Sequence, residues 1–424
     1  MKFLICFFIT LGAYSQSLKM NGISRGKYRV GFTDTVLFDS QDWYKYGQDS
    51  IKKPLWIQIW YPTEEKHFLP VSFREYVSVQ SDVLPKPWKS LFSSGVQQAI
   101  LTDLFKVKRD DKGKLQISDT VMMGWNTLLK STVSVKKDAK MAKGTFPVIL
   151  YHHGAQSVPF DNHLACEHWA SLGFIVASAW YNWPSEWAPD FPLVDQPIDT
   201  VYWENGVLVS DQKKTNLQDM KTVAHFMSSF PSTSKTGWVG VGHSMGAQRW
   251  LEYDFSTKPK VVERIISLHT TAESDQIEDL KNWHPNLLPL VTNGAALATT
   301  STYLLSPKNP QWFGKKTNLS DTLDDPGFFP FRKNPTTPYV FIAGPYVDHN
   351  AFISWLPWMA YLGRQISFHV PREDVEYYEK NWNYYREVIL ICDNILETSK
   401  KMESFQLPRR VTKSWAFERY RIRR

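Results

Sequence analysis

The feature that most constrains the fold is an alternation of short apolar runs with segments of helical periodicity between residues 146 and 271. The apolar runs are FPVILYHHG, FIVASAW, TGWVGVGHSMG and RIISLHTT. Each has the length and the continuous apolar character of a strand that is buried on both faces. Because strand, helix and strand follow one another in this order, the sequence predicts a mostly parallel sheet with helices on both faces, an α/β fold.

Two of the intervening segments have clear helical signals. The segment at 162–173 places Ala165, Trp169 and Leu172 on one face and ends in Gly173, which suits a C-cap. The segment at 215–227 predicts a second helix with Asn216 as its N-cap. Its apolar stripe consists of Leu217, Met220, Ala224 and Met227. Both helices therefore have one side suited to packing on a sheet.

The rest of the chain divides around this unit. Residues 26–62 alternate between apolar and polar residues in two runs, which predicts antiparallel strands at the front. Residues 63–143 are polar and Lys-rich, and we interpret them as an insertion that contains a helix. Residues 273–335 are interpreted as a second insertion. The expected organisation is one domain over residues 26–400, followed by a basic tail at 401–424.

The N-terminus has the pattern of an export signal. With 43% hydrophobic and 21% charged residues, the chain has the composition of a core-forming globular protein. Residues 1–15 combine one Lys, a short apolar run and Ala13-Tyr14-Ser15, as a secretory signal peptide does. We therefore expect a secreted or periplasmic protein; an apolar N-terminal strand is the alternative. No later apolar stretch reaches the roughly 20 residues that a membrane span needs.

The net charge of +7 does not indicate nucleic-acid binding. Residues 409–424 contain seven Lys or Arg and one Glu, so this tail supplies nearly all of the excess charge. A terminal basic tail is typically a solvated extension, and contact with an acidic surface is the alternative. We expect no nucleic acid as a partner.

Ser244 is the candidate nucleophile. It lies in Gly242-His243-Ser244-Met245-Gly246, and Gly-x-Ser-x-Gly alone is a weak signal. The signal becomes stronger here because a strand is expected before it and a helix after it. A nucleophile on a strained turn requires that context, with small flanking residues. The following helix also adds a positive dipole end. The alternative is a simple turn between a strand and a helix.

At this point the sequence resembles the α/β-hydrolase superfamily. It looks most like the secreted esterases related to platelet-activating-factor acetylhydrolase and dienelactone hydrolase. The resemblance covers most of residues 26–365, apart from the two insertions, and it implies that the insertion at 273–335 is a cap. The stretches that carry it are YRVGFTDTVLFD, PLWIQIWYP, GTFPVILYHHGAQ, ACEHWASLGFIVAS, GVGHSMGAQ and YVFIAGPYVDHNAF.

The resemblance implies an oxyanion hole made of two backbone N–H groups. One belongs to Met245, and the other to Ala155, in the loop that follows His153-Gly154. In enzymes of this kind, loss of one such donor raises the barrier by roughly 3–4 kcal/mol. We expect no cofactor and no metal site, since adjacent histidines in a strand point to opposite faces.

The predicted base is His349. A base must follow the nucleophile in chain order and lie in a loop after a late strand. His269, His284 and His369 lie in or beside strands or in a polar stretch, whereas His349 follows the apolar run PYVFIAG after a short loop. A solvated loop histidine is the alternative reading of this position.

The acid of the triad is where the sequence departs from the family pattern. The family usually places an Asp where this chain reads Ser267-Leu268-His269, and residues 280–320 contain no carboxylate. Three interpretations stay open. Glu273 replaces the missing Asp, a Ser-His dyad operates with a neutral partner, or the chain is an impaired hydrolase that binds a ligand. Losing the orienting carboxylate can cost on the order of 10⁴ in rate.

An aromatic-rich loop after FIVASAW is the predicted substrate site. It contains Trp180, Tyr181, Trp183, Trp187 and Phe191. Loops at the carboxyl ends of parallel strands line the ligand crevice in such folds, and flat aromatic faces suit a sugar ring, an aryl ester or an acyl chain. We therefore predict Trp180, Trp183, Trp187 and His153 as substrate-binding residues. A packed lid that excludes water is the alternative.

Taken together, these features predict an exported serine hydrolase. Its reaction is cleavage of a carboxylic ester, from a small molecule or linked to a carbohydrate, through an acyl-enzyme on Ser244. A ligand- or carbohydrate-binding pseudohydrolase on the same fold and a peptidase are the alternatives. Cys166 and Cys392 lie on helices that pack side by side in this fold, and two buried thiols are favoured over a disulfide.

Overall fold

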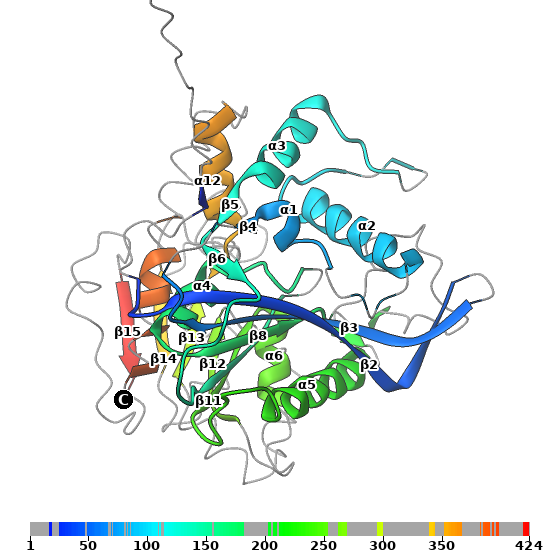
Figure 1. Ribbon diagram of the computed structural model, residues 1–424. Coiled ribbons are helices and arrows are strands. Elements are labelled where there is room, and N and C mark those ends of the chain that lie inside the picture. The colour runs from blue at the N-terminus through cyan, green and yellow to red at the C-terminus, as the bar shows by residue number, and fades with distance from the viewer. Residues whose placement is uncertain are drawn as a thin grey trace, which may run out of the picture.

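The structure is a computed structural model of the 424-residue chain (Figure 1). The residues that it describes, in part by their backbone alone, are 17–18, 25–46, 49–66, 69, 71–79, 82, 84, 86–108, 110–111, 114–154, 157–181, 202–204, 207–209, 212–252, 262–268, 295–299, 339–343, 352–366, 382, 385–390, 392–393, 396–397 and 419–423.

A ten-stranded sheet forms the centre of the described structure, in the order β15-β14-β13-β12-β11-β7-β8-β3-β2-β6. Its parallel strands are β7 (Val148–His152), β8 (Ile175–Ala179), β11 (Trp238–His243), β12 (Val262–Leu268), β13 (Ala295–Thr299) and β14 (Tyr339–Ala343). The long strands β2 (Arg29–Tyr46) and β3 (Asp49–Thr63) pair antiparallel with each other, and β3 pairs antiparallel with β8. The alternation of strands and helices in the sequence therefore produced the expected mostly parallel sheet.

Helices cover both faces of this sheet (Figure 1). Helices α5 (Gln212–Ser228) and α6 (Met245–Glu252) lie on one face. On the other face lie α4 (His163–Leu172), α12 (Trp355–Ile366) and the short helix α1 (Phe73–Tyr76). Further helices over that face are α2 (Lys86–Asp103) and α3 (Asp119–Lys130).

The pleat of each strand divides its side chains between two hydrophobic cores. In β3, Trp56 and Trp60 point into the core that contains α4 and α12, whereas Ile57 and Ile59 point into the core that contains α5 and α6. Strand β7 is buried along its whole length in the same alternating way. Because both faces are covered, these strands read as continuous apolar runs in the sequence.

The segment at 63–143 is built mainly into the core that contains α4 and α12, and its residues Ala139 and Ala142 belong to the other core. It contains α1, α2 and α3, the short strands β4 (Val71–Ser72), β5 (Thr132–Val133) and β6 (Val135–Lys137), and many of the buried apolar side chains on the face of α4 and α12. Strand β6 joins the main sheet by pairing with β2. Two small sheets complete the description, one from β4, β5 and β1 (Ser17–Leu18), the other from β9 (Tyr202–Glu204) and β10 (Val207–Val209).

Two local expectations differ from the structure. Helix α5 begins at Gln212, so Asn216 is an interior residue of the helix instead of its N-cap; its stripe nevertheless packs as expected, with Met220, Ala224 and Met227 buried. In the basic tail, the backbone of β15 (Arg419–Arg423) pairs antiparallel with β14 and forms the edge of the sheet, whereas a solvated extension was expected. An open sheet edge offers unpaired backbone groups, so a tail can pair with it instead of being solvated. The periodicity of five residues does not reveal such pairing.

The structure also bears on the cysteines and on membrane insertion. Cys166 and Cys392 are free, fully buried thiols, and burial raises the pKa of both. Within the described residues, no helix is both long and apolar enough to cross a bilayer. Nor does this part of the chain gather three or more side chains into a metal-binding group.

Candidate active site

Ser244 stands on a strained bend between β11 and α6. Its φ is 54°, a left-handed conformation that residues other than Gly rarely adopt. The Ser244 N–H donates to the carbonyl of Leu268 at the end of β12 (3.0 Å), and the Ser244 carbonyl accepts from Ala247 N–H in the first turn of α6 (3.0 Å). The bend is therefore held from the neighbouring strand and from the helix, and it leaves the serine partly exposed.

The glycines around Ser244 are required by close backbone contacts. A Cβ on Gly242 would lie 2.4 Å from the carbonyl carbon of Gly246. A Cβ on Gly246 would lie 2.2 Å from the His152 carbonyl oxygen. Neither position can hold a side chain without movement of backbone, which explains physically why Gly-x-Ser-x-Gly has small residues two before and two after the serine.

The end of β7 packs directly against this bend. Gly154, two residues after the strand ends, is so close that an added Cβ would lie 3.3 Å from the Ser244 Cβ and 3.0 Å from the His243 Nδ1. Met245 opens α6, where the first N–H groups have no partner within the helix. Ala155, the other predicted oxyanion donor, is outside the described residues, but the Gly154 that precedes it lies beside the serine.

His153 is buried completely, and both of its ring nitrogens are engaged. Nδ1 lies 2.8 Å from the Gly154 carbonyl oxygen, and Nε2 lies 3.2 Å from the backbone N of Tyr181, just beyond β8. A carbonyl oxygen only accepts, so the contact to Gly154 is a hydrogen bond when the imidazole proton is on Nδ1. Burial lowers the pKa of His153 to about 4, and the carbonyls of Gly154 and Ala179 oppose this shift. The imidazole is therefore neutral at pH 7.

His152 packs against Gly246 of the bend. Its ring stacks on that of Tyr181, with centroids 4.0 Å apart and planes 10° apart. Its Nδ1 lies 2.8 Å from the His153 carbonyl oxygen. Burial lowers its pKa well below the usual value, and His153 and Arg249 add to the shift. The two histidines thus form a neutral, closely packed layer beneath the end of β7.

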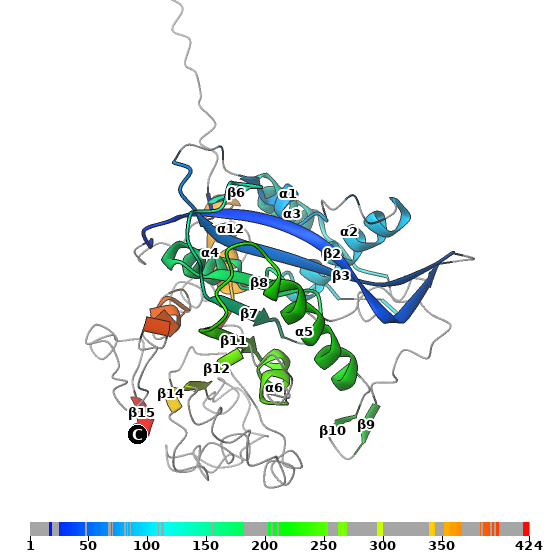
Figure 2. The same cartoon turned by 60° about the horizontal axis from the view of Figure 1, so that its bottom comes forward.

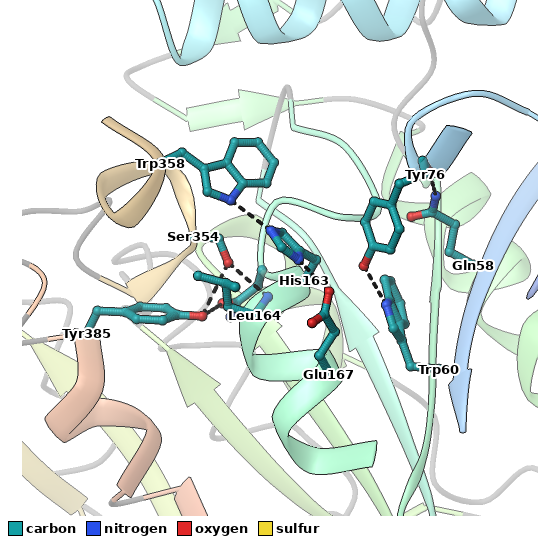
Figure 3. A network of polar contacts seen from close by, with 10 residues as sticks. Gln58, Trp60, Tyr76, His163, Leu164, Glu167, Ser354, Trp358 and Tyr385 are labelled. Atoms are coloured by element: carbon teal, nitrogen blue, oxygen red, sulfur yellow. Dashed lines mark hydrogen bonds and ion pairs between the residues drawn. The ribbon is translucent and has the colours of Figure 1, made fainter. Parts of the chain in front are cut away.

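A buried polar network joins the start of α4 to the chain around α12 (Figure 3). Asn162 donates from Nδ2 to the Phe352 carbonyl (3.1 Å) and accepts on Oδ1 from the Tyr385 hydroxyl (2.6 Å). The Ser354 N–H donates to the Asp161 carbonyl (2.8 Å). Since these groups are buried, they fix the start of the segment 352–366 against the junction of β7 and α4.

The same network continues along α4. His163 contacts Glu167 through Nδ1 at 2.9 Å and accepts from the Trp358 indole N–H on Nε2 at 2.8 Å. Figure 3 shows Trp358 of α12 reaching down onto the His163 ring, with Glu167 on the opposite side. The indole N–H only donates, so the His163 proton is on Nδ1 and points to the carboxylate. Helix α12 is therefore attached to α4 by a specific hydrogen bond as well as by apolar contact.

The predicted site residues fall into three groups. Ser244 and Met245 are at the bend, as expected. Trp180 and His153 are buried: Trp180 is 2% exposed, packs on Trp56 and donates its indole N–H to the Ser157 carbonyl (3.1 Å), so the structure places both side chains in the interior and not on a binding surface. The remaining predictions lie outside the described residues: His349, Glu273, Ala155, Trp183 and Trp187.

Sequence reasoning missed the supporting polar residues. Asp161, Asn162 and His163 are all fully buried. A usable signal was present, because Asp161 and Asn162 stand directly before α4 and His163 begins it, and this helix carries the apolar face that the sequence predicts. Three consecutive polar residues at such a place need buried partners, and these come from about 190 residues away.

Comparison with known proteins identifies the fold and leaves the family open. A ferulic acid esterase from Streptomyces cinnamoneus matches over 91% of this chain and 93% of its own, with a TM-score of 0.50 and 12% sequence identity. A second solved structure, DcsB in complex with its substrate analogue, matches 33% of this chain and 43% of its own with a TM-score of 0.22 at 13% identity, too little to compare folds. No protein-family model and no curated protein matches the sequence. The chain therefore has the α/β-hydrolase fold.

Proposed function

We propose that the protein is an exported serine hydrolase that cleaves a carboxylic ester through an acyl-enzyme on Ser244. The single observation that supports this most is the positive φ of Ser244 on the bend between β11 and α6, with Gly154 packed against its side chain. Strain of this kind is retained where a side chain must project from the backbone toward a reacting group.

In the proposed reaction, His349 takes the proton from the Ser244 hydroxyl as the oxygen attacks the ester carbonyl carbon. The negative charge that develops on the carbonyl oxygen is stabilised by the N–H groups of Met245 and Ala155. The intermediate then collapses, the alcohol leaves with the proton from His349, and the acyl group stays on Ser244. A water molecule, deprotonated by His349, releases the acid and restores the serine.

Chain connectivity supports His349 as the base. It stands three residues before Phe352, and three residues span at most about 11 Å. Phe352 is anchored to Asn162, and its neighbour Ser354 to Asp161. The Asp161 carboxylate accepts from the Tyr151 hydroxyl of β7 (2.8 Å), one residue before the strand end that packs on Ser244. These contacts favour a position of His349 near the carboxyl edge of the sheet.

Glu273 is our proposed acid. It follows Leu268, the residue whose carbonyl holds the Ser244 N–H, by five positions. The alternative function, a ligand-binding pseudohydrolase, is favoured by one observation: His269 occupies the place after β12 where the resembling esterases carry an Asp.

The test begins with labelling by a fluorophosphonate, with the modified residue located by mass spectrometry. We expect Ser244 to be labelled, and Ser244→Ala to abolish hydrolysis of p-nitrophenyl butyrate. The control Ser228→Ala changes a partly exposed serine at the end of α5 and should retain full activity. Equal turnover by wild type and Ser244→Ala would favour the pseudohydrolase or another nucleophile.

Further assays separate the finer proposals. Because the structurally similar protein is a ferulic acid esterase, methyl ferulate is a rational substrate to compare with short-chain esters and with a peptide p-nitroanilide. Preference for the anilide would indicate a peptidase. Unchanged kcat in Glu273→Gln would remove Glu273 from the triad. A mature N-terminus at Gln16 in protein recovered outside the cytoplasm would support export.

A further inference from the structure

Helix α6 carries a tryptophan that reaches back onto the strand before it. Trp250 is completely buried, and its indole N–H donates to the carbonyl oxygen of Val241 (3.1 Å). Val241 lies in β11, three residues before Ser244, whereas Trp250 lies in α6, six residues after Ser244. One side-chain hydrogen bond therefore joins the two arms of the bend that carries the proposed nucleophile.

The face of β11 beneath α6 leaves room for this ring. Trp238, Gly240 and Gly242 alternate along the strand, so they share the face on which α6 packs. A Cβ on Gly240 would lie 2.6 Å from Cδ2 of Trp250, so the indole lies directly on the Gly240 backbone. A Cβ on Gly242 would meet the backbone of Gly246. The two glycines thus let α6 approach β11 more closely than side chains would allow.

The conformation of Ser244 needs support of this kind. A positive φ in a residue other than Gly is unfavourable, and it persists where the surrounding structure fixes it. Two backbone hydrogen bonds act on Ser244 itself, because its N–H donates to Leu268 and its carbonyl accepts from Ala247. Neither bond fixes α6 to β11, since the first runs to β12 and the second stays within the bend. The hydrogen bond from Trp250 to Val241 does fix them.

We propose that Trp250 is a positioning residue, which holds α6 on β11 and so keeps Ser244 in the left-handed conformation from which its hydroxyl attacks an ester. This inference rests on the proposed function. It goes beyond a role in the core because the contact spans the bend. Without it, α6 can tilt, the φ of Ser244 can relax, and the hydroxyl moves. A displacement of about 1 Å in a reacting group can cost about 100-fold in rate.

Trp238 offers a matched control. It lies at the start of β11, is buried in the same core as Trp250, and also donates its indole N–H to a backbone carbonyl, that of Ser234 (2.6 Å). Ser234 precedes the strand, so this contact does not span the bend. Trp250→Phe and Trp238→Phe therefore remove the same chemical group from the same core, at opposite ends of β11.

We expect Trp250→Phe to lower kcat for p-nitrophenyl butyrate about 10- to 100-fold with KM changed less than about 3-fold, because a displaced hydroxyl affects the reaction more than binding. Trp238→Phe should stay within about 3-fold of wild type. The rate constant of fluorophosphonate labelling should fall in Trp250→Phe by the same ratio as kcat/KM, since both reactions begin with attack by Ser244. A merely structural role would lower the urea midpoint of both variants and leave the labelling rate unchanged.

Wild-type kcat in a folded Trp250→Phe variant would overturn the proposal, and so would equal losses of kcat in the two variants. If Trp250→Phe does not fold, hydrogen exchange of the wild-type indole N–H groups, followed by NMR, decides instead. The proposal requires the Trp250 N–H to exchange no faster than that of Trp238, and faster exchange contradicts it. Failure of the proposed function is recognised separately: Ser244→Ala would then equal wild type, whereas an error about Trp250 alone leaves Ser244 essential.

Discussion

The two faces of the central sheet are built in different ways. Over α5 and α6, the layer consists mainly of the crossover helices that the strand order itself demands, whose apolar residues pack with Ala139 and Ala142. Over α4, the layer also contains the segment 63–143, α12 and residues near 385–396. Figure 2 shows α1, α2 and α3 of this second layer on the side of β2 and β3 away from α5.

The two layers differ in how segments that are distant in sequence are held in place. On the α5 side the described buried ion pair is a single contact, Lys53 to Asp219, 2.7 Å long. On the α4 side a connected network attaches α12 and Tyr385 to Asn162 and His163 (Figure 3). The segments that are not crossover helices are thus held by directional hydrogen bonds. Such bonds define where a segment docks, whereas apolar contact alone does not.

The largest expected effect comes from the buried ion pair between Lys53 and Asp219 on the α5 side. Lys53→Met removes the cation that faces the buried Asp219 carboxylate, so we expect the free energy of unfolding to fall by about 3–5 kcal/mol. Urea denaturation followed by fluorescence measures it. The double variant Lys53→Met/Asp219→Leu should regain most of the loss. If the double variant is as unstable as the single one, the pair does more than neutralise a buried charge.

A second effect depends on pH and concerns the histidines beneath the bend. The pKa of His153 is about 4 when folded, against roughly 6.5 when unfolded, so between these values the unfolded chain binds more protons. The free energy of unfolding should therefore rise with pH from about 4 to 6.5, by up to about 3 kcal/mol for this group, and His153 should add no slope above that range. His152 shifts in the same direction.

Denaturation curves at several pH values test this effect. In His153→Asn the slope between pH 4 and 6.5 should be smaller, and the stability at pH 7.5 should be compared separately. An identical slope in wild type and variant would mean that His153 titrates alike in both states.

A smaller effect is expected from the network on the α4 side. Tyr385→Phe removes the hydroxyl that donates to Asn162, which should cost about 1–2 kcal/mol of stability. If the network also positions the segment that precedes Phe352, kcat should fall by more than KM changes. Tyr28→Phe is the control, because its ring packs on Phe146 and its hydroxyl has no hydrogen-bond partner among the described residues. A loss of stability with unchanged kcat would restrict the network to a structural role.

The smallest effect is expected at the surface. Asp82 is completely exposed, and although it pairs with Lys89 at 2.8 Å, solvent and salt screen the contact. Asp82→Asn should leave the urea midpoint unchanged within error at physiological salt. A measurable shift would show that α2 depends on surface charge, unlike the two buried layers.

Much of the fold could be predicted because it follows from local patterns. Buried strands read as apolar runs, and the helix at 163–172 ends where Gly173 adopts a φ of 110°. The bend at Ser244 was predictable because Gly242 and Gly246 leave no space for any other residue. The start of α5 was misjudged at Asn216, since the residues before it carry no apolar periodicity and still continue the helix.

The site was less predictable than the fold. Trp180 follows a buried strand and looked like part of a binding surface, but Trp56 and Phe92, from elements distant in sequence, enclose it. His153 was likewise predicted to bind substrate, but its two ring nitrogens contact Gly154 and Tyr181. In each case, whether a polar or aromatic side chain faces solvent depends on residues that sequence spacing does not bring together.

The sequence by itself determined the order of strands and helices, the parallel sheet and the bend that exposes Ser244, because these depend on periodicity and on steric limits within a few residues. Only the tertiary structure decided that the segment 63–143 completes a core, that part of the basic tail forms a sheet edge, and that His153 turns inward. Those outcomes depend on burial and hydrogen bonding between residues far apart in the chain, which become defined only when the layers pack.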